Sequence, residues 1–103
     1  LDDLDIDGQA VGFAEFVDIS LMGEVIWDGI VGLAFPNSAM KEKGLDPLMD
    51  TIMKKEIMTK KNLKNQFSYY LSSSSGALTF GGADPKYKKD PKAEFQFAPV
   101  VGE

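Results

Sequence analysis

Apolar and acidic residues alternate at the start of the chain. Over residues 3–7 every second residue is Asp, and the residues between are Leu and Ile. A period of two is typical of a half-buried strand. Asp7 and Gly8 form a tight-turn pair, because glycine adopts positive φ without a Cβ clash. The alternation resumes over residues 9–19, so the pattern predicts a β-hairpin.

Further along, apolar residues recur with the period of an α-helix. Asp46 and Pro47 favour a helix start, because Asp can cap free N–H groups and Pro fits the first helical position. The pattern predicts one clear α-helix near residues 46–57. Its apolar stripe consists of Leu45, Leu48, Met49, Ile52, Met53 and Ile57.

Four other segments indicate β-strands. Residues 25–35 are mostly apolar and contain Gly29 and Gly32, which suits a buried strand that another backbone approaches closely. Pro36 ends this run, and one short helical turn is expected after it. Because strands outnumber helices, the predicted fold class is mainly β. The remaining strands are expected at residues 66–71, 77–80 and 95–101.

Composition narrows the possible functions. The chain has 103 residues, a formal net charge of −5 and 44% hydrophobic residues, so it can form a small core but offers no basic face for nucleic acid. It contains no cysteine and no histidine, which removes histidine triads and histidine metal sites. No apolar run approaches the roughly 18 residues of a membrane span. Leu1 stands in place of an initiator Met, and we expect a piece of a longer protein.

Carboxylates remain as candidates for chemistry. Two nearby aspartates can share a proton and activate a water, which requires a tight turn such as Asp-Thr-Gly or Asp-Ser-Gly. Neither tripeptide occurs in the sequence. Asp28 is followed directly by Gly29, and Asp50-Thr51 is followed by Ile52 within the predicted helix. We therefore assign no catalytic residue.

The acidic residues before Gly8 have part of the pattern of a calcium loop. The Glu that would complete the loop is missing, because Ala14 occupies its position. We interpret these acidic residues instead as charges that keep the edge of a strand solvated. We predict no metal and no cofactor.

Three segments resemble, in order, segments of the pepsin-like aspartic proteases of family A1. Residues 27–36, Trp-Asp-Gly-Ile-Val-Gly-Leu-Ala-Phe-Pro, are similar to the family's Phe-Asp-Gly-Ile-Leu-Gly-Leu-Ala-Tyr-Pro. Residues 67–71, Phe-Ser-Tyr-Tyr-Leu, are similar to Phe-Ser-Val-Tyr-Leu. Residues 76–84, Gly-Ala-Leu-Thr-Phe-Gly-Gly-Ala-Asp, are similar to Gly-Glu-Leu-Thr-Leu-Gly-Gly-Ile-Asp, with Tyr87 downstream.

The resemblance implies a place within a larger fold. Pepsin-like enzymes have two β-rich lobes, each of which supplies one catalytic aspartate. Residues 1–103 would form the second half of the N-terminal lobe, a single incomplete domain without either catalytic motif. Ile30-Val31-Gly32 matches the hydrophobic-hydrophobic-Gly motif that lies beside a catalytic turn, where Gly32 would allow close backbone approach.

The resemblance also implies substrate-binding residues. Trp27, Ile30 and Leu21 match positions that line the family's apolar pocket next to the cleaved bond. Trp27 is larger than the family's usual Phe, which would reshape that pocket. For all three residues the alternative is an ordinary place in the core.

Two functions remain open, beside the weaker alternative of a self-contained structural domain. The first is a fragment of an aspartic endopeptidase that cleaves between bulky apolar residues, in which this chain supplies scaffold and subsite wall. Its partners would be a peptide or protein substrate and the rest of the same protease: the flap, the catalytic turns and the C-terminal lobe. The alternative is a catalytically inactive pepsin-like module that binds peptides or proteins. The resemblance implies the secretory pathway, an acidic vacuole or lysosome-like compartment, or the cell exterior.

Overall fold

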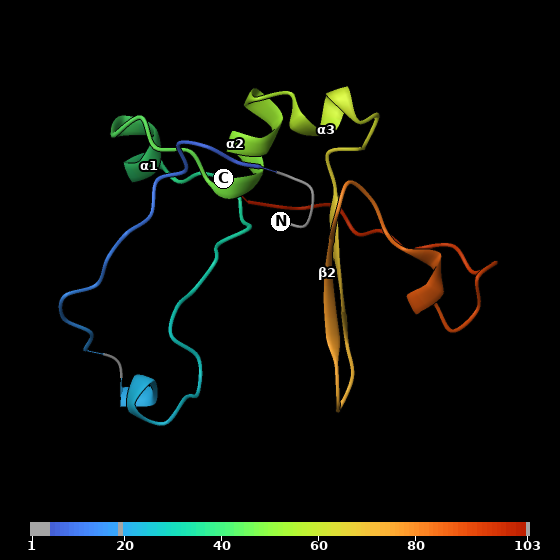
Figure 1. The fold of residues 1–103 in the computed structure, drawn as a ribbon, viewed down its shortest axis with the longest axis horizontal. Helices are drawn as coiled ribbons and strands as arrows, with labels where there is room; N and C mark the ends of the chain where they lie inside the picture. The colour runs from blue at the N-terminus through green and yellow to red at the C-terminus, as the bar shows by residue number, and fades with distance from the viewer. Residues whose placement is uncertain (1–4, 19, 103) are drawn as a thin grey trace. The chain divides into compact units, whose positions relative to one another are not determined.

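The structure, a computed structural model, describes residues 5–18 and 20–102, without the side chains of Leu21 and Met22. The chain divides into two compact units, residues 1–62 and residues 63–103. Figure 1 shows the elements, in which η denotes a 3-10 helix. In chain order they are η1 (Ser20–Gly23), α1 (Ser38–Glu42), α2 (Leu48–Lys54), α3 (Ile57–Lys60), β1 (Phe67–Leu71), β2 (Gly76–Phe80) and η2 (Pro85–Tyr87).

The buried part of the first unit is built on α2 and α3, which pack against each other. Ile52 and Met58 are fully buried, and Met49 is 9% exposed. Burying side chains of this size contributes about 1.5–3 kcal/mol each. The apolar stripe therefore identified two core residues correctly, while Met58 lay beyond the predicted helix.

The predicted helix over residues 46–57 is too long. α2 ends at Lys54, because Glu56 has a φ of 56°, in the left-handed region where an α-helix of L-residues cannot continue. The Glu56 amide donates to the Met53 carbonyl at 3.0 Å, which tightens the last turn. The Glu56 carbonyl then accepts from the Lys60 amide at 2.9 Å and starts α3.

The start of α2 also differs from the prediction. Pro47 is the N-cap rather than the first helical residue, and its carbonyl accepts from the Thr51 amide at 3.0 Å and the Thr51 hydroxyl at 3.3 Å. The Asp46 carboxylate accepts from the Lys54 Nζ at 2.6 Å. Asp46 thus links the two ends of α2 through an ion pair.

Two side chains attach the preceding segment to α2. Gln9 Nε2 donates to the Asp46 carbonyl at 3.0 Å, and Lys55 Nζ donates to the Asp7 carbonyl. Gly8, with a φ of 72°, turns the chain between these two contacts. The predicted Asp7-Gly8 turn is therefore confirmed.

The short helical turn expected after Pro36 is present as α1. The Asn37 side chain caps it by accepting from the Met40 amide at 2.8 Å, which satisfies one of the free donors at a helix start. The Asn37 carbonyl accepts from the Lys41 amide at 3.1 Å and begins the helical hydrogen bonds.

Four predicted strands, the two of the hairpin and those at residues 25–35 and 95–101, are wrong over the residues that the structure describes. Residues 5–18, 24–37 and 88–102 form no strand, and Figure 1 shows the first two as extended loops. Leu4 and Ile19, in the predicted hairpin, lie outside the described residues. A strand is stabilised by hydrogen bonds to a neighbouring strand, and the described residues supply no such neighbour for these segments. The mainly-β prediction is corrected accordingly: the described fold is mostly loop, with short helices and one two-stranded sheet.

The second unit is organised by the hairpin of β1 and β2, which confirms the strands predicted at residues 66–71 and 77–80. The strands pair antiparallel, with Phe67 opposite Phe80 and Leu71 opposite Gly76. The loop closes through Ser72, whose amide donates to the Ser75 carbonyl at 2.8 Å.

Gly81 ends β2 in a conformation that favours glycine. Its φ is 91°, and a Cβ built there would lie 2.7 Å from the Leu63 Cβ. Its amide donates to the Gln66 carbonyl at 2.7 Å, which fixes the open end of the hairpin. The predicted strand-ending turn at Gly81-Gly82 is confirmed.

Candidate functional site

The segment with the family signature, residues 27–36, lies in a loop of the first unit. Trp27 is 42% exposed, Ile30 77% and Val31 69%. These side chains are therefore not enclosed by the described part of the unit. Large exposed apolar sets of this kind mark surfaces that another molecule or segment covers.

Gly32 lies in open space. A Cβ built there meets no heavy atom within 4 Å, so the close backbone approach expected at this glycine is not made by the residues described here. Leu21 belongs to η1, but its side chain lies outside the described part. The pocket role of Trp27, Ile30 and Leu21 stays a prediction.

The carboxylates of the first unit form no catalytic arrangement. Asp28 lies in the exposed loop, and Asp50 lies in the first turn of α2. Thr51, its neighbour, is 7% exposed and donates its hydroxyl to the Pro47 carbonyl. The described residues contain no cluster of three or more His, Cys, Asp or Glu side chains suited to a metal.

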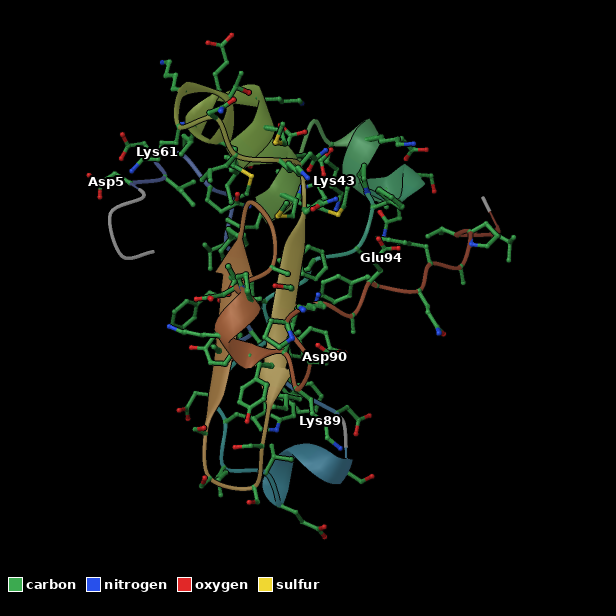
Figure 2. The ribbon with its side chains drawn as sticks, turned by 90° about the vertical axis from the view of Figure 1, so that its right-hand side faces the viewer. Asp5, Lys43, Lys61, Lys89, Asp90 and Glu94 are labelled. Atoms are coloured by element: carbon green, nitrogen blue, oxygen red, sulfur yellow. The ribbon has the colours of Figure 1, made fainter. Side chains whose placement is uncertain are left out.

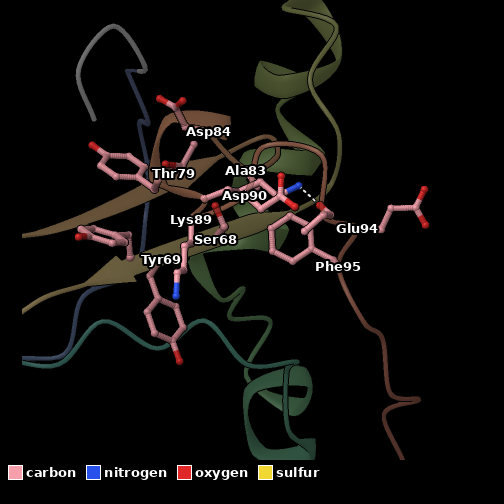
Figure 3. A pocket seen from close by; sticks show the side chains of 13 residues that line it. Ser68, Tyr69, Thr79, Ala83, Asp84, Lys89, Asp90, Glu94 and Phe95 are labelled. Carbon is pink, nitrogen blue, oxygen red and sulfur yellow. Dashed lines mark hydrogen bonds between the residues drawn. The ribbon is translucent and has the colours of Figure 1, made fainter.

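The second unit contains a pocket of about 670 Å³ beside the hairpin. Figure 3 shows Tyr69 and Phe95 among the side chains that line it. Its lining combines aromatic, cationic and acidic side chains: Ser68, Tyr69, Tyr70, Thr79, Ala83, Asp84, Tyr87, Lys88, Lys89, Asp90, Ala93, Glu94 and Phe95.

Aromatic contacts shape this pocket. The rings of Tyr70 on β1 and Tyr87 on η2 are stacked, with centroids 4.8 Å apart. The Lys88 Nζ lies 5.2 Å from the centroid of the Phe95 ring and donates to the Ala93 carbonyl. Ser68 donates its hydroxyl to the Gly82 carbonyl at 2.9 Å. The Tyr70–Tyr87 stack and the Ser68–Gly82 hydrogen bond join β1 to the segment after β2.

Asp84, which lines the pocket, forms an ion pair with Lys86. The Asp84 Oδ1 accepts from the Lys86 amide at 3.0 Å, and this backbone hydrogen bond is the main cause that lowers the pKa of Asp84. The Tyr87 side chain and then Asp84 raise the pKa of Lys86, whose Nζ lies 3.4 Å from Asp84 Oδ2. Both shifts favour the charged forms at neutral pH.

The pocket was not identified from the sequence. Tyr87 was noted only as part of a family segment, and the stack on Tyr70 depends on how η2 folds back towards β1. The local signal was Asp84-Pro85, a start for a short helix in which the Asp84 side chain caps the Lys86 amide. The pocket offers apolar contact and charge, but its lining has no histidine or cysteine for nucleophilic chemistry.

The chain belongs to the eukaryotic aspartyl protease family, whose sequence model matches residues 1–100. Plasmepsin VII of Plasmodium falciparum (isolate NF54) is 42% identical over 100 residues, which cover 97% of this chain and 22% of plasmepsin VII. Pepsin A of Gallus gallus is 32% identical over 87 residues, covering 82% of this chain and 22% of pepsin A. Cathepsin D of Chionodraco hamatus is 36% identical over 87 residues, which cover 69% of this chain and 20% of cathepsin D.

The chain thus spans about a fifth of the length of these relatives. The resemblance to pepsin-like aspartic proteases is confirmed at the level of the family. No solved structure matches the chain significantly. Among the helices of the described residues, none has the length and apolar character needed to cross a membrane.

Proposed function

We propose that this chain is part of an aspartic endopeptidase that cleaves peptide bonds between bulky apolar residues. The observation that carries the proposal is the family match over residues 1–100. The chain contains neither an Asp-Thr-Gly nor an Asp-Ser-Gly. The two aspartates that activate the water are therefore assigned to other parts of the same protease, and the chain alone is inactive.

In this proposal, residues 1–103 form the second half of the N-terminal lobe. Ile30-Val31-Gly32 lies beside one catalytic turn, and the open space at Gly32 leaves the room that a second backbone needs. The exposed side chains of Ile30 and Val31, at 77% and 69%, are available for contact with that turn and with substrate.

Trp27, Ile30 and Leu21 form the wall of the apolar pocket next to the cleaved bond. The indole of Trp27 has more surface than a Phe ring, so it narrows the pocket or changes its shape. Water attacks the peptide carbonyl without a covalent intermediate, and neither metal nor cofactor takes part. The protease acts in the secretory pathway, in an acidic compartment or outside the cell.

The test uses the full-length protein that contains this chain and fluorogenic peptides that differ only at the residues flanking the cleaved bond. Pepstatin-sensitive hydrolysis is expected from the full-length protein and not from the 103-residue chain. Trp27→Phe and Ile30→Ala are expected to change the ratio of kcat/KM between peptides with Phe and with Val by about tenfold, since side-chain size in an apolar pocket is worth about 1–3 kcal/mol.

Ile26→Ala is the matched control. Ile26 precedes Trp27, is 100% exposed and is not one of the three pocket positions, so its substitution is expected to leave the ratio unchanged. A full-length protein that binds peptides without hydrolysing them would instead identify the catalytically inactive module. An equal effect of Ile26→Ala and Ile30→Ala would reject the pocket assignment.

A further inference from the structure

The pocket of the second unit has the size and the composition of a ligand site. Its volume of about 670 Å³ lies within the range of about 300–1,000 Å³ that is typical of ligand pockets. Aromatic walls with a few polar groups that orient the ligand are the common composition of such sites. All residues that line the pocket belong to the second unit, whereas the family motif at residues 27–36 belongs to the first. The pocket is therefore a separate candidate for binding.

Two aromatic rings of the lining remain open to a ligand. Tyr69 on β1 is 70% exposed and Phe95 is 55% exposed, and both line the pocket (Figure 3). The other two rings, Tyr70 and Tyr87, are stacked on each other and form a fixed part of the wall. A ligand ring would therefore be buried against Tyr69 and Phe95, in the offset or edge-to-face arrangement that aromatic pairs prefer.

Lysines of the chain itself already lie over two of the aromatic rings. Lys88 Nζ lies 5.2 Å from the centroid of the Phe95 ring, and Lys86 Nζ lies 4.8 Å from the centroid of the Tyr87 ring. A cationic ligand would compete with these ammonium groups for the ring faces and would be repelled by them. The aromatic lining therefore favours a ligand whose ring carries no positive charge.

One cation of the lining is available to a ligand. Among the described residues, Lys89 forms no hydrogen bond, ion pair or ring contact. Lys88, the other cation of the lining, donates to the Ala93 carbonyl and to the Pro91 carbonyl at 3.5 Å. Figure 2 shows Lys89 in the loop after η2. Because an ammonium group has three donors and no acceptor, a carboxylate is a fitting partner for Lys89.

The carboxylates of the lining leave Lys89 accessible to such a partner. Asp84 has its own ion-pair partner at 3.4 Å, and Asp90 Oδ1 accepts from the Lys92 amide at 2.9 Å. In Figure 3 the Glu94 carboxylate points away from the other labelled side chains. Apart from the paired Asp84, the lining contains two lysines and two carboxylates, so its charges balance. A ligand carboxylate can therefore approach Lys89 without displacing an ion pair.

We propose that this pocket binds the carboxyl end of a short peptide that ends in an aromatic residue. The ring of the last residue packs against Tyr69 and Phe95, and the terminal carboxylate accepts hydrogen bonds from Lys89 Nζ. The ring supplies apolar burial, and the carboxylate fixes the orientation of the peptide. Binding requires no hydrolysis and no residue of the first unit, so it is independent of the proposed endopeptidase activity.

The test measures peptide affinity by calorimetry on the full-length protein that contains this chain. Saturating pepstatin is present, so that a substrate cleft in the rest of the protein does not contribute. The probes are acetyl-Gly-Gly-Phe as the free acid, the same peptide as its carboxyl-terminal amide, and acetyl-Gly-Gly-Ala as the free acid. The Phe acid is expected to bind about threefold to fivefold more tightly than its amide, as for an ion pair at an exposed site. It is expected to bind at least about tenfold more tightly than the Ala acid, because the ring is buried against two aromatic side chains.

Matched variants assign the two contacts. Lys89→Gln is expected to remove the preference for the acid over the amide and to leave the affinity for the amide unchanged. Tyr69→Ala is expected to weaken both Phe peptides, whereas Tyr69→Phe keeps the ring and most of the affinity. Lys92→Gln is the control, because Lys92 is an exposed lysine of the same loop that does not line the pocket. This variant is expected to bind all three peptides as the wild type does.

Three results would overturn the proposal. The first is no binding of the Phe acid to the full-length protein, as would occur if other parts of the protein cover the pocket. The second is equal affinity for the acid and the amide. The third is an equal effect of Lys89→Gln and Lys92→Gln, which would show a general charge effect instead of a contact in the pocket. Lys89→Gln alone decides the outcome if Tyr69→Ala does not fold, since Lys89 is exposed and its substitution removes no contact within the described chain.

Discussion

The ring of Tyr70 stacks on the ring of Tyr87, with an angle of 18° between the two planes. The first residue lies on β1 and the second on η2, so the stack joins the hairpin to the segment that follows it. Lys86 Nζ lies 4.8 Å from the centroid of the Tyr87 ring. The loop after β2 is therefore held in place by an aromatic contact and a cation–π contact.

Tyr87→Ala is expected to loosen this loop and the hairpin. Loss of the stack and of the apolar contact of the ring would lower the opening free energy of β1 amides by about 1–2 kcal/mol, as measured by hydrogen exchange in the full-length protein. Tyr87→Phe keeps the ring and is expected to keep most of the protection. Equal losses in the two variants would show that the hydroxyl, rather than the stack, is responsible.

Gly81→Ala is expected to destabilise the open end of the hairpin by about 1–3 kcal/mol, because the new side chain adopts an unfavourable φ and collides with Leu63. Hydrogen exchange of the Gly81 and Tyr70 amides measures the effect. Gly12→Ala is the control, since a Cβ there meets no heavy atom within 4 Å and its φ lies outside the left-handed region. Adding Leu63→Ala to Gly81→Ala is expected to recover only the stability lost through the collision with Leu63, and not the part lost through the unfavourable φ.

The Asp84 carboxyl is expected to titrate below its ordinary value, which side-chain NMR can follow. Its pKa is lowered in the folded chain, so its contribution to stability is present above the ordinary value, about 4, and is lost as pH falls through the lower folded pKa. The main cause is the Lys86 backbone N–H, which Lys86→Ala retains. That variant should keep most of the shift; a return to the ordinary value would assign the shift to the lysine side chain.

Ile52 is expected to be the most sensitive position of the first unit. Ile52→Val should lower the opening free energy of α2 amides by about 0.5–1.5 kcal/mol and Ile52→Ala by about 2–5 kcal/mol, because each leaves a larger cavity at a fully buried position. Hydrogen exchange in α2 and α3 provides the measurement. A loss confined to α2, with α3 unaffected, would contradict the packing of the two helices.

The elements that the sequence predicted well are those whose partners lie close by in the chain. β1 and β2 are separated by one short loop, so alternating apolar residues and a closing turn suffice to define the pair. α1 could be predicted for the same reason, since the residue that caps it, Asn37, directly precedes the helix. Residues 25–35 have an equally apolar pattern, but a strand there needs a distant partner that the pattern cannot identify.

The break after α2 could not be predicted for a different reason. Glu56 is a residue with good helix propensity, and neither Gly nor Pro marks the turn. α2 and α3 pack against each other and bury Ile52 and Met58 fully, although Glu56 between them adopts a left-handed conformation. Local propensity was overridden by packing, which only the folded structure reveals.

The two parts of the candidate site differ in the same way. The family motif at residues 27–36 was visible as a string of residue types, whereas the described residues leave its Trp27, Ile30 and Val31 side chains exposed. The pocket of the second unit depends on a ring stack between residues 17 positions apart, Tyr70 and Tyr87, and no periodicity predicts such a contact. Sequence motifs identify the family here, and the contacts identify the residues that shape the surface.

The exposed loops of the first unit have a practical consequence for handling the chain. Large apolar side chains are in direct contact with water: Phe13 is 97% exposed, Ile26 100% and Phe35 80%. Produced by itself, such a polypeptide will bind hydrophobic dyes, adsorb to surfaces and associate with further copies as its concentration rises. Its solubility is therefore a direct assay of whether these side chains have been covered: co-production with the segments that cover them should turn an insoluble product into a soluble one.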